Sequence, residues 1–223
     1  MTPARRRPDA AGRRALALYR GLPGSARAHV VVRWWTAPFP AVEAALPRSG
    51  RILEIGCGHG LFAAYAAQAA PGREVLGTDV DEAKIALARS AARAMAPRLR
   101  FAPAVSGAVP AGPWDAVAIL DVLYLLPAEA QHDLLLACVA QLAPGGVLLL
   151  KEMSCTPAWK ARWNRLQETL AVKVLRITAG HDFDFVPTEL VCRWLADAGL
   201  AVTVHPLDRA RLHPHQLVVA RRP

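Results

Sequence analysis

The chain has 223 residues, of which 53% are hydrophobic and 20% charged, and its formal net charge is +9 at pH 7. This length suits one domain with a full core, and the apolar content excludes an intrinsically disordered chain. No apolar run approaches the roughly 20 residues of a transmembrane helix. The positive charge alone does not indicate nucleic-acid binding, because Arg is abundant together with Ala and Pro, a bias that genome composition can produce as well as function.

The N-terminal residues 1–48 predict a basic arm followed by a helical extension. Residues 1–9 form the arm, and residues 10–20 favour a short helix that ends at the Gly- and Pro-containing residues 21–24. A further helix is expected to end near Leu46. The apolar stretch after the basic start is too short for a signal peptide, so we expect a cytoplasmic protein.

Residues 51–60, Arg-Ile-Leu-Glu-Ile-Gly-Cys-Gly-His-Gly, organise the rest of the chain. Their first half predicts a short buried strand, and the glycines after it predict a tight turn that leads into a helix. Strand, glycine turn and helix form the start of a βαβ unit. The N-terminus of such a helix offers free N–H groups to a ligand.

The segments that follow alternate between strands and helices, which predicts parallel strands joined by right-handed crossovers. We expect strands over 51–55, 74–78, 99–103, 115–121 and 146–151, helices near 60–70, 82–95, 128–142 and 187–198, and a final strand pair over 200–205 and 216–220. Residues 49–223 form a single α/β domain in this prediction. The four cysteines lack Cys-x-x-Cys spacing, which argues against a zinc site and against a disulfide framework.

The glycines of the turn are Gly56, Gly58 and Gly60, and Glu54 precedes them. A dinucleotide-binding loop carries Gly or Ala at its sixth position, where this chain has Leu61. The pattern Glu-x-Gly-x-Gly-x-Gly instead resembles the first motif of class I S-adenosylmethionine-dependent methyltransferases.

Acids at the ends of two predicted strands strengthen this resemblance. Asp79 lies about 20 residues past the glycines, where a carboxylate can accept hydrogen bonds from ribose hydroxyls, and Asp81 is available to cap the next helix. Asp121 ends the fourth strand, and a Pro-Gly-Gly turn at 144–146 leads into the fifth. These stretches follow the order of the later methyltransferase motifs.

The resemblance implies a Rossmann-like fold with S-adenosyl-L-methionine as cofactor. Its sheet would be seven-stranded and mostly parallel, in the order 3-2-1-4-5-7-6 with the last strand antiparallel and helices on both faces. The residues expected to bind the cofactor are Glu54, Gly56, Cys57, Gly58, Gly60, Asp79, Val80, Ser106 and Asp121.

Two parts of the chain bear on how the cofactor would be enclosed. Many relatives carry an acid after strand three for the adenine amino group, whereas residues 101–106 contain no carboxylate, so Ser106 or a backbone carbonyl is expected there instead. In this family a helical N-terminal extension often covers the cofactor. The adjacent Trp34 and Trp35 either form that cover or anchor the extension on the domain.

The acceptor is expected at the loops after strands four and five, because ligands of open α/β sheets bind at the carboxyl ends of the strands, near the switch in strand order. The segment 152–186 follows strand five and resembles the cap-like insertion of small-molecule relatives. An oxygen or nitrogen acceptor can require a general base, and the candidates are His181, which lies beside Asp182, and then Glu152 and Tyr124. No metal site is expected.

The leading hypothesis is a methyltransferase that acts on a small-molecule or lipid-like acceptor. The basic arm leaves an RNA methyltransferase as an alternative, although residues 121–124 lack the Asn/Asp-Pro-Pro-aromatic motif of nucleic-acid amino methylases. A nicotinamide-dependent oxidoreductase is opposed by Leu61 and by the later motifs. A non-catalytic subunit that binds S-adenosylmethionine is the remaining alternative, and the sequence leaves the oligomeric state open.

Overall fold

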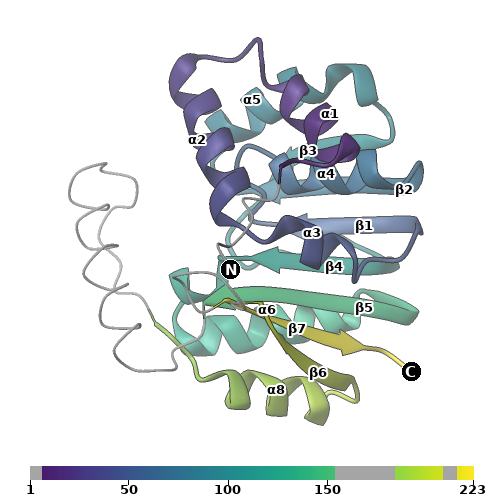
Figure 1. Cartoon of the computed structure of the whole chain (residues 1–223). Helices are drawn as coiled ribbons and strands as arrows, with labels where there is room; N and C mark the ends of the chain where they lie inside the picture. Colours follow the sequence, from purple (N-terminus) through teal and green to yellow (C-terminus); the bar gives the residue numbers. More distant parts are fainter. Residues whose placement is uncertain (1–6, 154–183, 208–214) are drawn as a thin grey trace, which may run out of the picture.

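A computed structural model describes residues 7–153, 184–207 and 215–223 of the chain. The described strands form one seven-stranded sheet in the order β3-β2-β1-β4-β5-β7-β6, which confirms the predicted fold class (Figure 1). Strands β1 to β5 pair in parallel, and β7 is antiparallel to both of its neighbours. The strands are β1 Ser49–Ile55, β2 Gly72–Asp79, β3 Leu99–Pro103, β4 Trp114–Leu120, β5 Leu142–Met153, β6 Ala201–Pro206 and β7 His215–Arg221.

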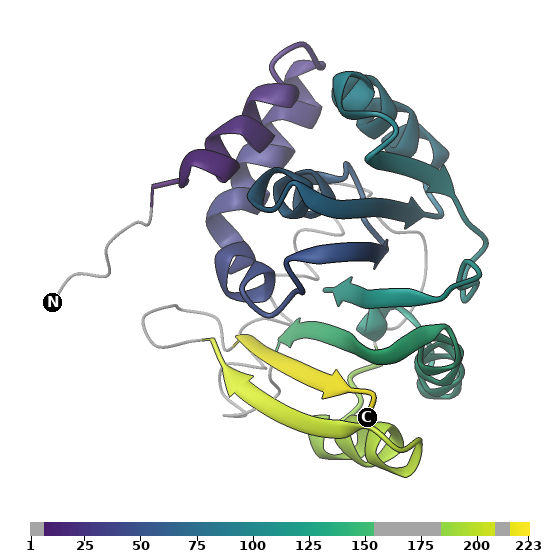
Figure 2. The same cartoon turned by 90° about the vertical axis from the view of Figure 1, so that its right-hand side faces the viewer.

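Helices cover both faces of the sheet (Figure 2). Successive strand residues point to opposite faces, so that Ile52 joins one apolar core and Leu53 the other. Helices α1 to α5 contribute to the first core, and α6 and α8 to the second. The described helices are α1 Ala10–Leu18, α2 Gly24–Thr36, α3 Phe39–Glu43, α4 Leu61–Ala69, α5 Glu82–Ala92, α6 Ala128–Ala140 and α8 Thr188–Asp197, with the single 3-10 turns η1 Arg93–Met95 and η2 Leu123–Leu125.

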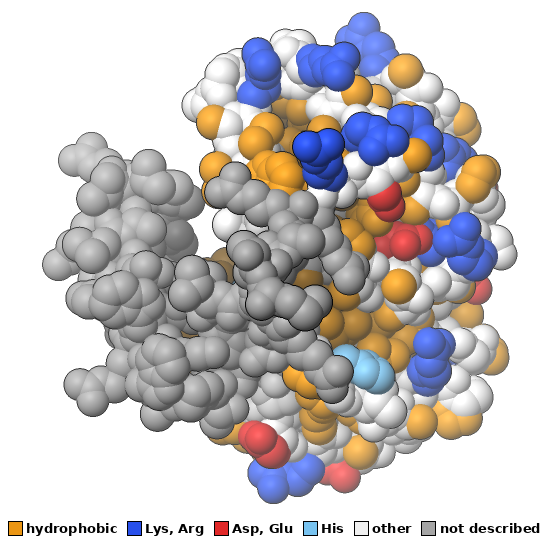
Figure 3. Space-filling model, in the orientation of Figure 1, with side chains coloured by type: hydrophobic (Ala, Val, Ile, Leu, Met, Phe, Trp, Pro, Cys, Tyr) orange, Lys and Arg blue, Asp and Glu red, His pale blue; other side chains and the backbone are white. Residues whose placement is uncertain are grey.

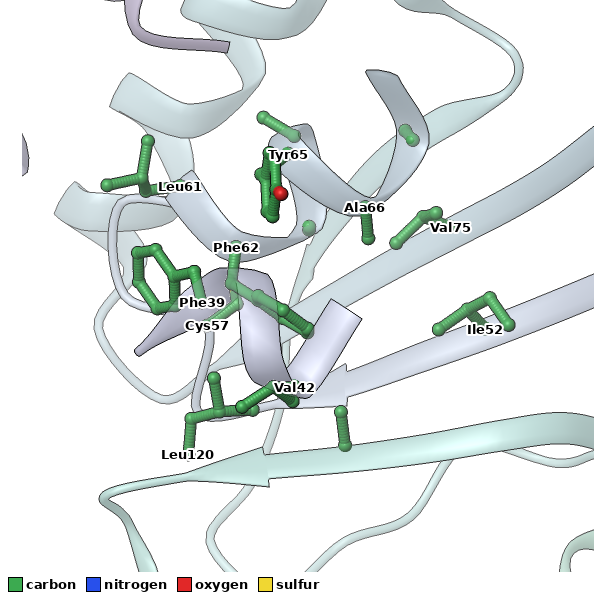
Figure 4. Close-up of a cluster of buried hydrophobic side chains, with 14 of the residues drawn as sticks. Phe39, Val42, Ile52, Cys57, Leu61, Phe62, Tyr65, Ala66, Val75 and Leu120 are labelled. Carbon is green, nitrogen blue, oxygen red and sulfur yellow. The ribbon is translucent and has the colours of Figure 1, made fainter. Parts of the chain in front are cut away.

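Helix α4, which follows the glycine turn, is buried from Leu61 to Ala67. A helix that is apolar on all sides needs cover on all sides. The sheet covers one side of α4, and α1 and α3 contact the other. Figure 4 shows Phe39 of α3 beside Phe62 of α4, with ring centroids 5.5 Å apart. The N-terminal helices therefore complete the core rather than lying apart from it.

Helix α2 differs from the sequence-based prediction, which places no helix over 24–36. The three consecutive valines 30–32 are β-branched and weak helix formers, and no side chain caps the start of α2. Its buried residues Ala26, Val30 and Trp34 recur every fourth position, and Val30 and Trp34 belong to the first apolar core. Tertiary packing of this face stabilises the helix against its local propensity.

Strand β5 also differs from its predicted bounds, because it begins at Leu142 rather than at 146. The Pro-Gly-Gly turn lies within it, and its register with β4 shifts between Trp114 and Ala116. Within the described ranges, no helix has the length and apolarity needed to cross a bilayer.

Candidate functional site

The turn after β1 contains three glycines with positive φ angles: +71° at Gly56, +55° at Gly58 and +77° at Gly60. A Cβ atom at Gly56 would lie 2.3 Å from Val122, and one at Gly60 would lie 2.3 Å from the Phe101 ring. Packing therefore requires glycine at both positions. A Cβ atom at Gly58 would meet no atom of the described residues within 4 Å. The Gly58 backbone thus borders open space, where a ligand can approach it.

Asp79 ends β2 and braces this turn. Its Oδ2 accepts a 2.7 Å hydrogen bond from the Gly58 amide, and its Oδ1 accepts a 2.9 Å bond from the Asp81 amide. Asp81 caps α5, because its own carboxylate accepts a bond from the Lys84 amide. An ionised carboxylate has about four acceptor positions, so Asp79 retains acceptor capacity for a ligand beside Gly58.

Glu54 lies beneath the turn and is only 4% exposed. Its Oε2 accepts a 2.8 Å bond from the Ala63 amide in the first turn of α4. Gly60, the residue that precedes this helix, has no side chain with which to cap it, so Glu54 satisfies one of the free N–H groups. Burial raises the pKa of Glu54 to about 8, and its carboxyl group is therefore protonated at neutral pH.

The N-terminal helices cover the outside of the turn. The Tyr19 hydroxyl donates a 2.8 Å bond to the His59 carbonyl, and the His29 ring lies 4.9 Å from the His59 ring. Trp34 is buried and packs edge-on against the Tyr65 ring, at 5.1 Å. Trp34 therefore anchors the N-terminal extension, whereas Trp35, its neighbour in the sequence, is exposed. Figure 3 shows Lys and Arg side chains over the part of this face that the N-terminal helices occupy in Figure 1.

A buried charge cluster lies where β4 ends. Asp121 has a φ of +59°, unusual for a residue other than glycine. Its Oδ2 lies 2.7 Å from Nη1 of Arg33 on α2, and its Oδ1 accepts a bond from Nζ of Lys151 on β5. Burial opposes ionisation of Asp121, but the two cations outweigh it and lower the pKa of its carboxyl group. The cluster links α2, β4 and β5 at the switch in strand order.

A small cavity lies beside Glu152 at the end of β5. Glu152 Oε1 accepts bonds of 3.4 and 3.3 Å from the amides of Val122 and Leu123, and burial raises its pKa to about 8. The rings of Tyr124 and Phe185, which also line the cavity, stack with centroids 5.3 Å apart. The cavity volume of about 30 Å³ admits a water molecule but not an organic acceptor.

The structure gathers the described candidate residues at one edge of the sheet. Glu54, the three glycines and Asp79 lie at the ends of β1 and β2, and Asp121, Tyr124 and Glu152 lie at the ends of β4 and β5. Val80 is 63% exposed beside Asp79, Ser106 is exposed after β3, and Cys57 is buried behind the turn. His181 and most of the predicted insertion 152–186 lie outside the described residues.

Four residues of this site, Tyr19, His29, Arg33 and Lys151, were not assigned to it from the sequence. No local motif marks them, because each reaches the site from an element remote in the sequence from the partner it contacts. The one available signal was the position of Arg33 beside the Trp pair in the N-terminal extension.

Comparison with known proteins identifies the family. A family model described as a methyltransferase domain matches residues 31–205. The chain is 30% identical over 185 residues to a ubiquinone biosynthesis O-methyltransferase of Xanthomonas axonopodis pv. citri, across 75% of each chain.

Solved structures with the same fold include an O-methyltransferase family protein from Burkholderia thailandensis, with a TM-score of 0.69 and 20% identity over 87% of this chain and 57% of that one. Another is magnesium protoporphyrin IX methyltransferase from Synechocystis PCC 6803 with bound SAH, with a TM-score of 0.63 and 18% identity over 97% and 96% of the two chains. Because the family model spans most of the chain, this protein belongs to the methyltransferase domain family and is a class I methyltransferase with S-adenosyl-L-methionine as its methyl donor.

Proposed function

We propose that this enzyme transfers the methyl group of S-adenosyl-L-methionine to an oxygen atom of a small-molecule or lipid-like acceptor. The observation that carries the choice of oxygen is the 30% identity, across 75% of each chain, to a relative named as an O-methyltransferase of ubiquinone biosynthesis. The choice of a small acceptor has the same support.

The residues on the donor side fit the adenosyl part of the cofactor. Asp79 offers carboxylate oxygens to a pair of vicinal hydroxyls, as its remaining acceptor capacity allows. The open backbone at Gly58 admits close approach, and the exposed side chain of Val80 offers apolar surface to a flat ring. Glu54 contributes indirectly, because it fixes the start of α4 beneath the turn.

When bound, the cofactor supplies a methyl carbon that its sulfonium already activates for displacement. The chain then mainly has to align the acceptor oxygen with that carbon, and such alignment is worth roughly 7–11 kcal/mol in favourable cases. Glu152 and Tyr124 lie on the acceptor side, after β5 and β4. Burial raises the pKa of Glu152 to about 8, so this carboxyl group can act as a general base only in its ionised form, whose share grows as the pH rises toward that value. His181 remains a proposed base on sequence grounds.

Calorimetric titration with S-adenosylhomocysteine tests the donor half, with NADH and NADPH as controls. We expect binding of the first ligand alone. Asp79→Ala should weaken it by at least about tenfold, since one charge-assisted hydrogen bond is worth about 1.5–3 kcal/mol. Asp115→Ala is the matched control, because Asp115 also accepts a backbone bond, from the Arg51 amide at 2.7 Å, but at the start of β4. Unchanged affinity in folded Asp79→Ala would remove Asp79 from the site.

Turnover tests the acceptor half. The protein would be incubated with labelled S-adenosyl-L-methionine and a panel of hydroxylated aromatic compounds, and the products would be located by mass spectrometry. We expect methyl ethers. Methylation only on nitrogen or on added RNA would contradict the choice of oxygen, and binding without any product would favour the non-catalytic alternative.

A further inference from the structure

Helix α2 has two apolar faces, of which one is buried and the other exposed. Ala26, Val30 and Trp34 form the buried face. The residues of the other face recur at the i, i+3, i+4 and i+7 spacing of an apolar helix stripe. They are Ala28, Val31, Val32 and Trp35, and we call them the outer stripe. Its three larger side chains are 48%, 60% and 45% exposed, in chain order.

This exposure contrasts with helix α4, which is also apolar on all sides. The sheet covers one side of α4, and α1 and α3 contact the other. The described residues give the outer stripe of α2 no comparable cover. Exposing apolar side chains to water costs free energy, and a contiguous apolar patch marks a contact surface more often than scattered side chains do. The spacing and the exposure of the outer stripe therefore indicate a contact surface.

Positive charge gathers in the same part of the chain. Residues 7–36, which contain α1 and α2, include six Arg residues and a single acid, Asp9. Asp9 is already engaged, because its carboxylate accepts bonds from the Gly12 amide and the Tyr65 hydroxyl. Five of the six Arg side chains are exposed, and none of the five joins a salt bridge among the described residues. They are Arg7, Arg13, Arg14, Arg20 and Arg27.

The charges lie beside the outer stripe rather than within it. Arg27 precedes Val31 by four positions, so the two side chains are neighbours on the helix surface. Figure 3 shows hydrophobic side chains where α2 lies in Figure 1, with Lys and Arg side chains beside them. A guanidinium keeps its charge throughout the physiological pH range. An apolar centre with a basic rim fits a partner that combines negative charge with an apolar layer.

An anionic lipid bilayer fits this surface better than other partners of matching size or charge. A second copy of the chain is disfavoured, because a two-fold contact would place the same Arg residues of both copies together. RNA supplies phosphates, but single strands bind by stacking on aromatic rings, which Val31 and Val32 lack. A bilayer supplies phosphate headgroups for the Arg residues and an acyl boundary for an apolar helix face that includes a Trp.

We propose that the outer stripe and the neighbouring Arg residues dock the protein on the surface of an anionic lipid bilayer. The last turns of α2 reach the candidate site, because Arg33 lies 2.7 Å from Asp121 and 3.4 Å from the Leu120 carbonyl. Docking through α2 thus brings the edge at which β4 and β5 end close to the bilayer (Figure 1). The inference goes beyond the proposed function and does not depend on the identity of the acceptor.

Sedimentation with lipid vesicles tests the docking. The protein would be mixed with sucrose-loaded vesicles of phosphatidylcholine alone, or of phosphatidylcholine and phosphatidylglycerol in equal parts, and the bound fraction would be measured after centrifugation. The triple variant Val31→Ser, Val32→Ser, Trp35→Ser removes the outer stripe. The double variant Leu136→Ser, Val204→Ser is the matched control, because these two residues are 39% and 45% exposed, on α6 and β6.

We expect wild type to prefer the vesicles that contain phosphatidylglycerol. The triple variant should bind them at least about tenfold more weakly, and the control should bind them as wild type does. Replacing Arg20 and Arg27 by Gln should weaken binding by roughly fivefold for each Arg removed. The same change at Arg100 and Arg193, which are exposed on β3 and α8, should have a much smaller effect.

Tryptophan quenching by brominated acyl chains locates the contact, and it does so even if the triple variant fails to fold. Such chains quench a Trp only where it reaches the bilayer. Trp35→Phe keeps an apolar side chain at this position, so it should retain vesicle binding and lose part of the quenching seen in wild type.

Equal binding of the triple variant and wild type to the anionic vesicles, or quenching that Trp35→Phe leaves unchanged, would overturn the proposal. Absence of vesicle binding by wild type would also overturn it, and two further measurements would then reassign the surface. Binding to transfer RNA that the Arg variants weaken would assign it to nucleic acid, and a dimer that the triple variant dissociates in light scattering would assign it to a second copy. Failure of wild type to bind S-adenosylhomocysteine would instead overturn the proposed function and leave this inference standing.

Discussion

Replacing Glu54 by Gln tests whether the carboxyl group beneath the glycine turn is protonated in the folded protein. Glu54 is 4% exposed, and burial raises its pKa to about 8. In the unfolded chain a Glu carboxyl group titrates near its ordinary pKa of about 4.3. Between these two values the folded state binds a proton that the unfolded state has released.

The sign of the effect follows from this difference in bound protons. Because the folded state binds more protons, the free energy of unfolding falls as the pH rises. The contribution of Glu54 is fully present below about pH 4.3 and is lost as the pH rises through about 8. Its slope is about 1.4 kcal/mol per pH unit, which amounts to about 2 kcal/mol between roughly pH 5.5 and 7. A Gln at this position does not titrate and lacks this dependence.

Urea unfolding of wild type and of Glu54→Gln at several pH values across that interval measures the effect. The difference between the two proteins isolates Glu54, since the other titrating groups contribute to both. We expect the stability of wild type relative to the variant to fall by about 2 kcal/mol. Glu74→Gln, at an exposed position of β2, provides a control. A difference that stays constant with pH would show that Glu54 is ionised in the fold and would refute the reasoning.

Two further predictions use matched pairs of residues. Gly58→Val should abolish binding of S-adenosylhomocysteine, because the valine side chain would enter the open space beside the turn, at a φ of +55°. Gly199→Val is the control, because it also introduces a side chain at a positive φ, +86°, with no neighbour within 4 Å, but after α8. It should leave binding unchanged. Equal affinities in the two variants would mean that the turn does not contact the ligand. Trp34→Ala should lower the free energy of unfolding by about 3–5 kcal/mol, because Trp34 is 6% exposed, and Trp35→Ala should change it by about 0.5 kcal/mol or less, because Trp35 is 45% exposed. Chemical denaturation measures both, and similar losses would contradict the anchoring role of Trp34.

The fold could be predicted because its determinants are local. Short apolar strands alternate with helices, and the glycine turn fixes where the first crossover begins. The assignment of the helix cap to Asp81 rather than to Asp79 was equally local, because an Asp directly before a helix can accept a hydrogen bond from an amide of its first turn. The structure confirms this cap. Helix α2 could not be predicted in the same way, because its buried face is stabilised by tertiary packing, such as that of Trp34 against Tyr65 of α4.

The candidate site was only partly visible in the sequence for the same physical reason. Glu54 belongs to a motif, so its presence at the site was predictable, but its bond to the Ala63 amide depends on the packing of α4 over β1. The cluster of Arg33, Asp121 and Lys151 draws on three elements that are far apart in the chain. Charge pairing of this kind follows from the topology of the sheet, and no spacing in the sequence encodes it.

The backbone of Asp121 shows why the cluster needs a carboxylate at this position. A residue other than glycine at a φ of +59° carries strain of about 1–3 kcal/mol, which glycine would avoid. Glycine would also leave Lys151, at 1% exposure, as an unpaired buried cation, at a cost of about 3–5 kcal/mol. The second term is the larger, so the chain retains Asp and accepts the strain. The same carboxylate also pairs with Arg33. The strained residue after β4 therefore pairs with the buried Lys151 and holds the Arg33 guanidinium in place at the site.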